Sequence, residues 1–138
     1  MEDVRRGIYL APSLGPTFFQ KNLSIARNAV AVKSDSGGFD TSGILLAKGS
    51  TPHTAVFRNV MLRENHVRRY GEAGAPWAGI EVADIDTGIV EQNWVGHEVG
   101  GKDRNAIQIS YSGNVVVRKN TSRGVALGDG NWGVQIGQ

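Results

Sequence analysis

The sequence predicts an all-β protein whose chain winds into stacked coils, and two observations support this. The first is that a pair of short phrases recurs along the 138 residues at nearly constant spacing. The second is that each phrase alternates apolar with variable residues, which is typical of a strand and not of a helix. A repeat at a fixed distance indicates one supersecondary unit per coil, with neighbouring coils burying a shared core.

The first phrase places apolar residues between two asparagines, with threonine as the first residue in one copy. Its copies are residues 22–28, 59–65, 87–93 and 114–120. The residues that its alternation points inward are Leu23, Ile25, Val60, Leu62, Val90, Val115 and Val117. We expect the final residues of the copies, Asn28, Asn65, Asn93 and Asn120, to form a ladder of amide hydrogen bonds between coils about 4.8 Å apart. We also expect them to adopt the left-handed backbone of a sharp turn, which asparagine tolerates.

The second phrase is a small residue followed by an apolar, a variable and an apolar residue. Its copies are residues 7–10, 43–46, 79–82, 106–109 and 133–136. Their first apolar residues are 36, 36, 27 and 27 positions apart, so the early coils are nine residues longer. The extra length falls in residues 11–21 and 47–58, which contain proline and glycine and are predicted to be loops. A third short strand in each coil is expected at residues 30–32, 66–68, 94–95 and 125–127.

Charged residues near the end of the first phrase also fit stacked coils. In the stacked alignment they form two columns, one of Ala26, Arg63, Glu91 and Arg118 and the other of Arg27, Glu64, Gln92 and Lys119. Neighbours in each column are opposite in charge or neutral, and opposite charges on adjacent strands stabilise a sheet. The columns therefore predict a solvated sheet face with compensated charge.

Composition excludes several classes of function. The formal net charge of +2 is too small to imply a nucleic-acid or membrane-surface partner. No apolar run approaches the roughly 18 residues of a membrane-spanning helix, so we expect no membrane insertion. Cysteine is absent, which rules out disulfides and thiolate metal sites. No apolar signal core is visible near the N-terminus.

The two phrases, written N-[VIL]-x-[VIL]-x-x-N and G-[IV]-x-[VIL], resemble the repeats of the pectate-lyase-like superfamily. The resemblance covers residues 7–136. It implies a right-handed parallel β-helix of four to five coils, a solenoid formed by residues 1–138 as one domain or as a segment of a larger β-helix. Members of the superfamily bind or process long polysaccharides. The resemblance thus implies a polysaccharide partner and an extracellular, cell-surface or periplasmic location.

Candidate binding residues lie in four loops between the first and second phrases, at residues 34–42, 68–78, 96–105 and 123–132. Three large aromatic residues, Phe39, Trp77 and Trp132, come just before second phrases, and their flat faces suit stacking on sugar rings. Asp129 lies in the same loop as Trp132 and joins them as a candidate carbohydrate ligand. The alternative is that the aromatic rings cap the core or cover loop backbone.

Candidate catalytic residues cluster in residues 96–104, where His97, Glu98, Asp103 and Arg104 lie among glycines. A polysaccharide lyase needs a base near a sugar proton and a cation at the sugar carboxylate. A glycoside hydrolase needs two carboxylates, which Glu98 could form with Asp103 or Asp129. The alternative interpretation is a solvated loop.

Several absences temper the prediction of an enzyme. The paired-aspartate and Gly-His-Gly motifs of polygalacturonases, the Asp-Pro-His-Asp motif of alginate epimerases and the Arg-x-Pro-x-x-Arg stretch of pectate lyases do not occur. Asp84 and Asp86 could contribute to a Ca²⁺ site but are far short of a full ligand set, and the histidines have no metal-binding spacing, so no cofactor or metal is expected. His66 follows Asn65 and is expected to pack at that turn. The alternative function is a structural or adhesive module whose coils stack end-on or as a homo-oligomer.

Overall fold

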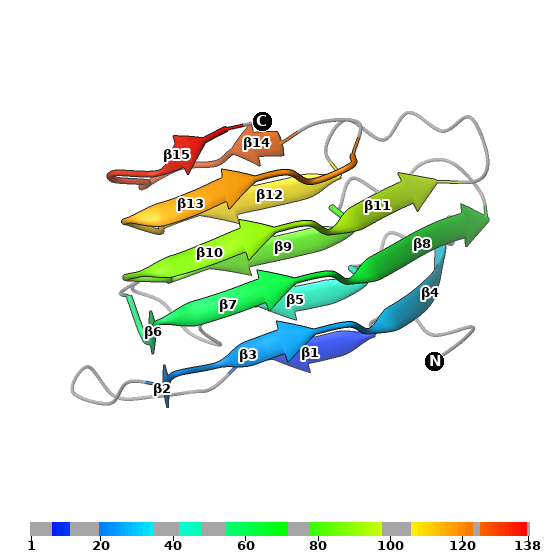
Figure 1. Ribbon diagram of the computed structural model, residues 1–138, viewed down its shortest axis with the longest axis horizontal. Coiled ribbons are helices and arrows are strands. Elements are labelled where there is room, and N and C mark those ends of the chain that lie inside the picture. Colours follow the sequence, from blue (N-terminus) through cyan, green and yellow to red (C-terminus); the bar gives the residue numbers. More distant parts are fainter. Residues whose placement is uncertain are drawn as a thin grey trace.

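The computed structural model describes residues 7–11, 20–34, 42–47, 55–71, 78–97, 106–122 and 125–137. All secondary structure in these residues is β, and the strands pair in parallel within sheets that are open at their edges, an arrangement compatible with a β-solenoid (Figure 1). The described part of the chain contains no helix that is long and apolar enough to cross a membrane. The prediction of an all-β protein with parallel strands is therefore confirmed.

The first sheet is built mainly from second phrases. Its strands, in spatial order, are β1 (Ile8–Leu10), β5 (Ile44–Leu46), β9 (Ile80–Ala83), β12 (Ile107–Ser110) and β14 (Val125–Leu127). The second sheet runs beside it and is built mainly from first phrases. Its strands are β3 (Ser24–Ala26), β7 (Val60–Arg63), β10 (Gly88–Glu91), β13 (Val115–Arg118) and β15 (Gln135–Ile136).

The third sheet follows the second in the first three coils, where a third short strand is predicted. It contains β4 (Ala29–Ser34), β8 (His66–Gly71) and β11 (Trp94–His97). Two further strands, β2 (Gln20–Lys21) and β6 (Phe57–Arg58), pair with each other at the ends of the segments predicted to be insertion loops. The residues that the structure describes in those segments thus include a short parallel pair.

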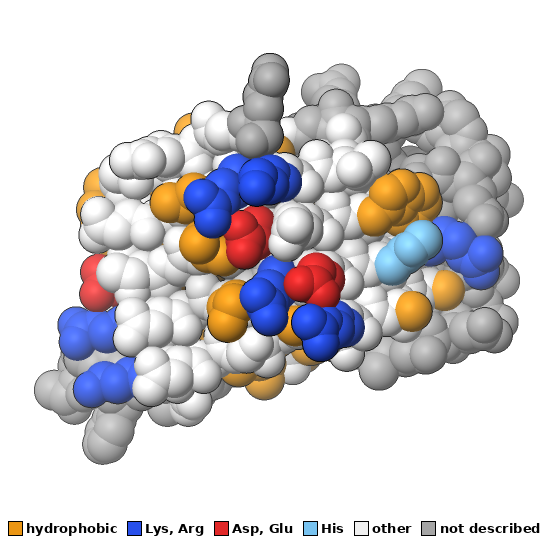
Figure 2. Space-filling model, in the orientation of Figure 1, with side chains coloured by type: hydrophobic (Ala, Val, Ile, Leu, Met, Phe, Trp, Pro, Cys, Tyr) orange, Lys and Arg blue, Asp and Glu red, His pale blue; other side chains and the backbone are white. Residues whose placement is uncertain are grey.

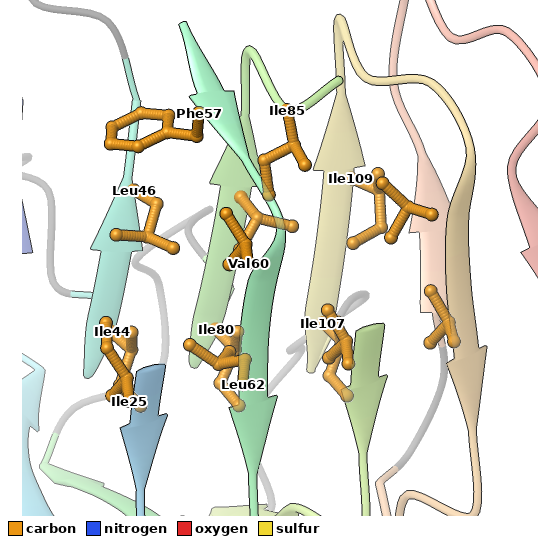
Figure 3. Packing of buried hydrophobic residues seen from close by; sticks show 14 of the residues in the cluster. Ile25, Ile44, Leu46, Phe57, Val60, Leu62, Ile80, Ile85, Ile107 and Ile109 are labelled. Carbon is orange, nitrogen blue, oxygen red and sulfur yellow. The ribbon is translucent and has the colours of Figure 1, made fainter. Parts of the chain in front are cut away.

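The core lies between the first and second sheets and is formed by the predicted inward residues. Ile44, Ile80 and Ile107 pair in register along the first sheet, and Leu62 and Val90 do so along the second. All five are fully buried, and Figure 3 shows the isoleucines and leucines of the two sheets meeting between the strands. Parallel strands buried on one face favour such β-branched side chains.

The last coil differs from the prediction. Ile107 pairs with Val125, 18 residues further on, whereas Ile80 pairs with Ile107, 27 residues further on. The segment 125–127, predicted to be a third strand within a loop, is therefore β14 of the first sheet. The segment 133–136, predicted to be a second phrase, instead contributes β15 to the second sheet, where Ile136 pairs with Val117. The physical reason is that, among the described residues, the third face of this coil contributes a single bridge between Trp94 and Thr121, so the chain reaches the first sheet sooner.

The asparagine ladder is confirmed. Nδ2 of Asn28 donates to Oδ1 of Asn65 at 3.0 Å, Nδ2 of Asn65 to Asn93 at 2.9 Å, and Nδ2 of Asn93 to Asn120 at 3.0 Å. Each backbone N–H of the first three asparagines donates to the same oxygen of the next coil. Each coil is thereby tied to the next by side-chain as well as backbone hydrogen bonds.

The predicted left-handed backbone at the ladder asparagines is wrong by one residue. The positive φ angles occur at the residues just before them, namely Arg27 (58°), Glu64 (54°), Gln92 (55°) and Lys119 (53°). Left-handed asparagines do occur, but at the start of the phrase, at Asn22, Asn59 and Asn114. The ladder residue is then free to point its amide inward, because the turn has been made one residue earlier.

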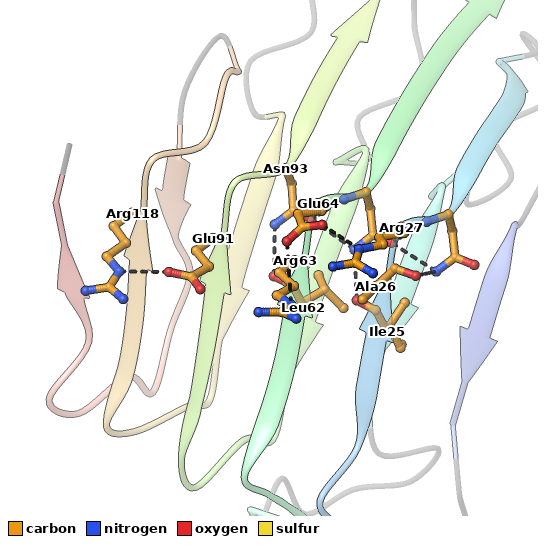
Figure 4. Close-up of polar contacts among 11 residues, drawn as sticks. Ile25, Ala26, Arg27, Leu62, Arg63, Glu64, Glu91, Asn93 and Arg118 are labelled. Atoms are coloured by element: carbon orange, nitrogen blue, oxygen red, sulfur yellow. Dashed lines mark hydrogen bonds and ion pairs between the residues drawn. The ribbon is translucent and has the colours of Figure 1, made fainter.

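The predicted charge compensation on the second sheet is visible in Figure 4. Nε of Arg27 lies 2.7 Å from Oε2 of Glu64, and Nε of Arg118 lies 2.9 Å from Oε2 of Glu91. Both pairs join neighbouring coils. On the solvated face of this sheet, ion pairs therefore connect adjacent coils along the stacked columns.

Candidate functional site

A hollow of about 360 Å³ opens on the outer face of the first sheet. It spans strands β5, β9, β12 and the end of β14. Its lining residues are Ala47, Glu81, Ala83, Gln108, Ser110, Tyr111, Gly128 and Asp129. We call this set the groove. Because strand side chains alternate between faces, its strand residues Glu81, Ala83, Gln108 and Ser110 lie on the face opposite to neighbours that fill the core.

Small residues form one column of the groove. Ala83 and Ser110 pair directly across β9 and β12, and Gly128 follows β14. A Cβ atom on Gly128 would collide with Oγ of Ser110, so this glycine permits the close approach of the two strands at that point. The result is a depression between larger side chains.

Polar residues form the adjacent column. Glu81 and Gln108 are Cα partners at the variable position of two second phrases. Oε2 of Glu81 accepts a hydrogen bond of 3.5 Å from Oγ of Ser42. Nε2 of Gln108 donates to Oγ of Ser110, also at 3.5 Å. A carboxylate, an amide and a hydroxyl thus lie together on the outer face of the sheet.

The rim of the groove is set by a tight turn at the corner of the last coil. Tyr111 and Gly130 both have positive φ, at 46° and 69°. The backbone N–H of Tyr111 donates to the carbonyl of Asp129 at 2.8 Å. A Cβ atom on Gly130 would collide with the Tyr111 ring, so the ring lies directly over the glycine. The turn therefore holds an aromatic ring and an exposed carboxylate at one edge of the groove.

Trp132 lies three residues beyond Asp129 and rests against Gly113 of the preceding coil, its bridge partner. Its side chain is 45% exposed. Asn131, the residue before Trp132, anchors the backbone at this point. Its Oδ1 accepts a hydrogen bond from the N–H of Ser112 at 3.0 Å, and its Nδ2 donates to the carbonyl of Ile109 at 2.9 Å. The indole is therefore presented on a well-anchored backbone.

Of the residues predicted for carbohydrate binding, Asp129 lines the groove and Trp132 lies near it in the chain. Phe39 and Trp77 lie outside the described residues. Of the predicted catalytic cluster, His97 ends β11 on the third sheet, but the position of its side chain is not described. Glu98, Asp103 and Arg104 lie outside the described residues, so their role stays a prediction.

Sequence reasoning missed Glu81, Gln108 and Tyr111. The first two occupy the variable position of the second phrase, which the repeat pattern leaves unconstrained and which points outward. That position is the signal that could have found them, because outward residues on adjacent strands must line a common surface.

Asp84 and Asp86, the acidic pair suggested for Ca²⁺, lie in different environments on either side of a turn. Asp84 is fully buried and has positive φ, whereas Asp86 lies 3.1 Å from Nε of Arg58, measured from Oδ2. Ile85, between them, is fully buried in the core. Among the described residues, no group of three or more histidine, cysteine or acidic side chains is arranged to hold a metal ion.

Apolar side chains are exposed at both ends of the stack. A second hollow of about 330 Å³ lies at the first coil and is lined by Tyr9, Leu10, Ala11, Gln20, Leu23 and Phe57. At the other end, Leu127 of β14 and Ile136 of β15 are 51% and 50% exposed, although their positions point inward in earlier coils. In the part of the chain that the structure describes, each end of the stack thus has exposed apolar side chains.

Comparisons of the chain with protein-family models, with curated proteins and with solved structures gave no match.

Proposed function

We propose that the chain is a right-handed parallel β-helix that binds a polysaccharide in the groove on the first sheet. Parallel stacking of successive coils and the asparagine ladder support the β-helix. The right-handed winding follows from the strong preference of parallel crossover connections for that hand. The binding role is supported by one observation: the polar residues Glu81, Gln108 and Asp129 line the same groove as the ring of Tyr111.

The chemistry of the groove fits a ligand rich in hydroxyl groups. Carboxylate and amide oxygens of Glu81, Asp129 and Gln108 accept hydrogen bonds, and the Gln108 amide also donates them. The Tyr111 ring offers an apolar face with a polar end. The floor of small residues leaves room for a sugar ring close to the sheet. A long solenoid surface would let successive sugars contact successive coils.

A matched pair of substitutions tests this proposal. Glu81→Gln should weaken binding of the best glycan from a panel of acidic and neutral polysaccharides about tenfold, which corresponds to about 1.4 kcal/mol. Glu64→Gln, the same change on the second sheet, should leave affinity unchanged. Affinities measured by calorimetry decide the matter. Absence of binding to every glycan in the panel, or equal loss in both variants, contradicts the proposal.

The same panel tests for catalysis. Glu81 and Asp129 are two carboxylates in one groove, the kind of pair that glycoside hydrolysis requires. A hydrolase would release new reducing ends and a lyase new unsaturated ends. We propose turnover as the enzymatic form of this function, with Asp129→Asn expected to abolish product formation. Binding without products in the wild-type protein would leave the groove as a recognition site.

The alternative function is a structural or adhesive shaft, which the exposed Leu127 and Ile136 favour. Open strand edges and uncovered core residues are suited to end-on stacking with further coils. In this proposal the protein forms oligomers whose sedimentation coefficient rises with concentration. Leu127→Glu should abolish the rise, whereas Ser24→Glu, on an exposed outward position of β3, should not. A monomer at all concentrations contradicts stacking.

A further inference from the structure

Two aromatic rings contact each other on the outer face of the third sheet, away from the groove. The centroids of the His66 and Trp94 rings are 4.1 Å apart and their planes are inclined by 40°. The two residues are Cα partners on β8 and β11. His66, which was expected to pack at the turn after Asn65, is instead exposed, and Trp94 is 39% exposed.

Gly96 leaves room for the Trp94 indole on the outer face of the strand. A Cβ atom on Gly96, two residues further along β11, would collide with three carbons of the six-membered ring. Gly96 faces the same side of the strand as Trp94, because residues two apart share a face. The indole therefore lies close to the backbone of its own strand, with the His66 ring against it, and part of its surface stays exposed.

A cation and small residues surround the rings. Arg68 on β8 is the Cα partner of Gly96 and is exposed, so its side chain emerges beside the indole. In the column of the rings, Ala29 precedes His66 and Thr121 follows Trp94, and both are exposed. Figure 2 shows a histidine between a large hydrophobic group and Lys or Arg side chains, with small hydrophobic side chains beside it. The two rings therefore project further from the sheet than the small side chains of Ala29 and Thr121 in the same column.

We propose that Trp94, His66 and Arg68 form a second binding site, for a pyranose that carries an anionic substituent. The exposed part of the indole would contact the apolar C–H face of the sugar, and Arg68 would pair with its carboxylate or sulfate. The imidazole extends the platform and offers a hydrogen-bonding nitrogen at its edge. This site does not depend on the groove, because the two lie on different sheets.

The aromatic rings alone would accept many flat ligands, so the preference for an anionic sugar comes from Arg68. Arg68 supplies a planar set of donors that matches an anionic oxygen pair, which neutral sugars lack. The backbones that carry Arg68 and the indole are neighbouring strands, about 4.8 Å apart, so one sugar ring could reach both side chains. Uronic acids and sulfated sugars share this chemistry.

The test uses the whole ¹⁵N-labelled chain and follows the indole N–H signal of Trp94, assigned with Trp94→Phe. The probes are a tetramer of galacturonic acid, its neutral methyl ester and a sulfated neutral tetrasaccharide. At least one anionic probe should shift the Trp94 signal saturably, at least tenfold more tightly than the ester. No saturable shift with either anionic probe, or equal affinity for the ester, overturns the proposal. Binding of only one anionic probe supports it and identifies the substituent.

A matched pair of variants isolates the cation. Arg68→Gln should reduce affinity for the anionic probe about tenfold, whereas Arg118→Gln, an exposed arginine on the second sheet, should have no such effect. Equal loss in both variants would overturn the site. The groove variant Glu81→Gln should leave the Trp94 shifts intact, so failure of the groove and failure of this site are distinguishable. A tyrosine-containing peptide that binds more tightly than the anionic sugars would also contradict it.

Discussion

The side-chain amide of Asn65 donates to Oδ1 of Asn93 at 2.9 Å, and both residues are 1% exposed. The backbone N–H of Asn65 donates to the same oxygen at 3.0 Å. Asn93 in turn donates from Nδ2 to the carbonyl of Leu62 at 3.0 Å. One buried amide therefore satisfies three polar groups of the coil that precedes it.

Asn93→Ala should destabilise the protein strongly. The change leaves two buried donors on Asn65 and the carbonyl of Leu62 without this partner, and an unsatisfied buried polar group costs about 1–3 kcal/mol. We expect a loss of about 3 kcal/mol in the free energy of unfolding, measured in urea. Ser24→Ala, at an exposed position of the same sheet, should change it little. A similar loss in both variants would show that the ladder contributes nothing specific.

Gly43→Ala tests close packing at the corner before β5. A Cβ atom there would collide with a methyl group of Val67 and lie 3.0 Å from the carbonyl oxygen of Gly79. Overpacking of this kind costs about 1–3 kcal/mol, so the melting temperature should fall. Gly137→Ala is the matched control, because its Cβ would meet nothing closer than 3.8 Å. Thermal unfolding that is unchanged in Gly43→Ala would contradict the packing described.

The ion pair between Arg27 and Glu64 should make stability depend on acid pH. The hydrogen bond from Arg27 lowers the pKa of the Glu64 carboxyl below its ordinary value of 4.5. A lowered pKa stabilises the folded state above the ordinary value, and this contribution disappears as the pH falls through the lowered pKa. Wild type should therefore exceed Glu64→Gln in stability slightly at neutral pH, and the difference should vanish once the pH has fallen below the lowered pKa. Because the pair is solvated, salt should also reduce the difference. A difference that grows in acid would refute this assignment.

Filling the groove should block binding without harming the fold. Ala47 lies just after β5 and is partly exposed, so Ala47→Leu would place a larger apolar side chain in the hollow. We expect at least a tenfold loss of glycan affinity, or about 1.4 kcal/mol, with an unchanged melting temperature. Ala26→Leu makes the same substitution at a partly exposed position of β3 on the second sheet and should leave affinity at the groove intact. Undiminished binding by Ala47→Leu would move the site elsewhere.

Much of the fold could be predicted because its repeat fixes both spacing and direction of side chains. Alternation placed Ile44, Ile80 and Ile107 on one buried line, and the structure confirms that line. A final asparagine in each first phrase was enough to predict the ladder, since an amide can bridge one strand spacing. These features are local in the sequence and identical from coil to coil.

The last coil could not be predicted from the same pattern. A stretch such as residues 133–136 has the alternation of a strand, but alternation does not say which sheet a strand joins. That choice depends on the length of the coil, and β14 enters the first sheet nine residues earlier than the preceding spacing suggests. The order of sheets around the coil then carries β15 into the second sheet.

The candidate sites were only partly predictable for a related reason. Asp129 and Trp132 stand out as an acid and a large aromatic in a glycine-rich stretch, whereas Glu81 and Gln108 occupy positions where the pattern accepts any residue. Likewise, the contact of Trp94 with His66 joins residues 28 positions apart, and only the strand register brings them together. Composition alone does not reveal such a pairing.

The unequal coils have a consequence for how this architecture can diversify. Stacked β-branched residues stay aligned whether 36, 27 or 18 residues separate them, as for Ile44 with Ile80, Ile80 with Ile107 and Ile107 with Val125. The register of the core residues is thus independent of the length of each coil. Segments can be gained or lost at a corner while the neighbouring layers keep their contacts, so selection can reshape the exterior of one layer at a time.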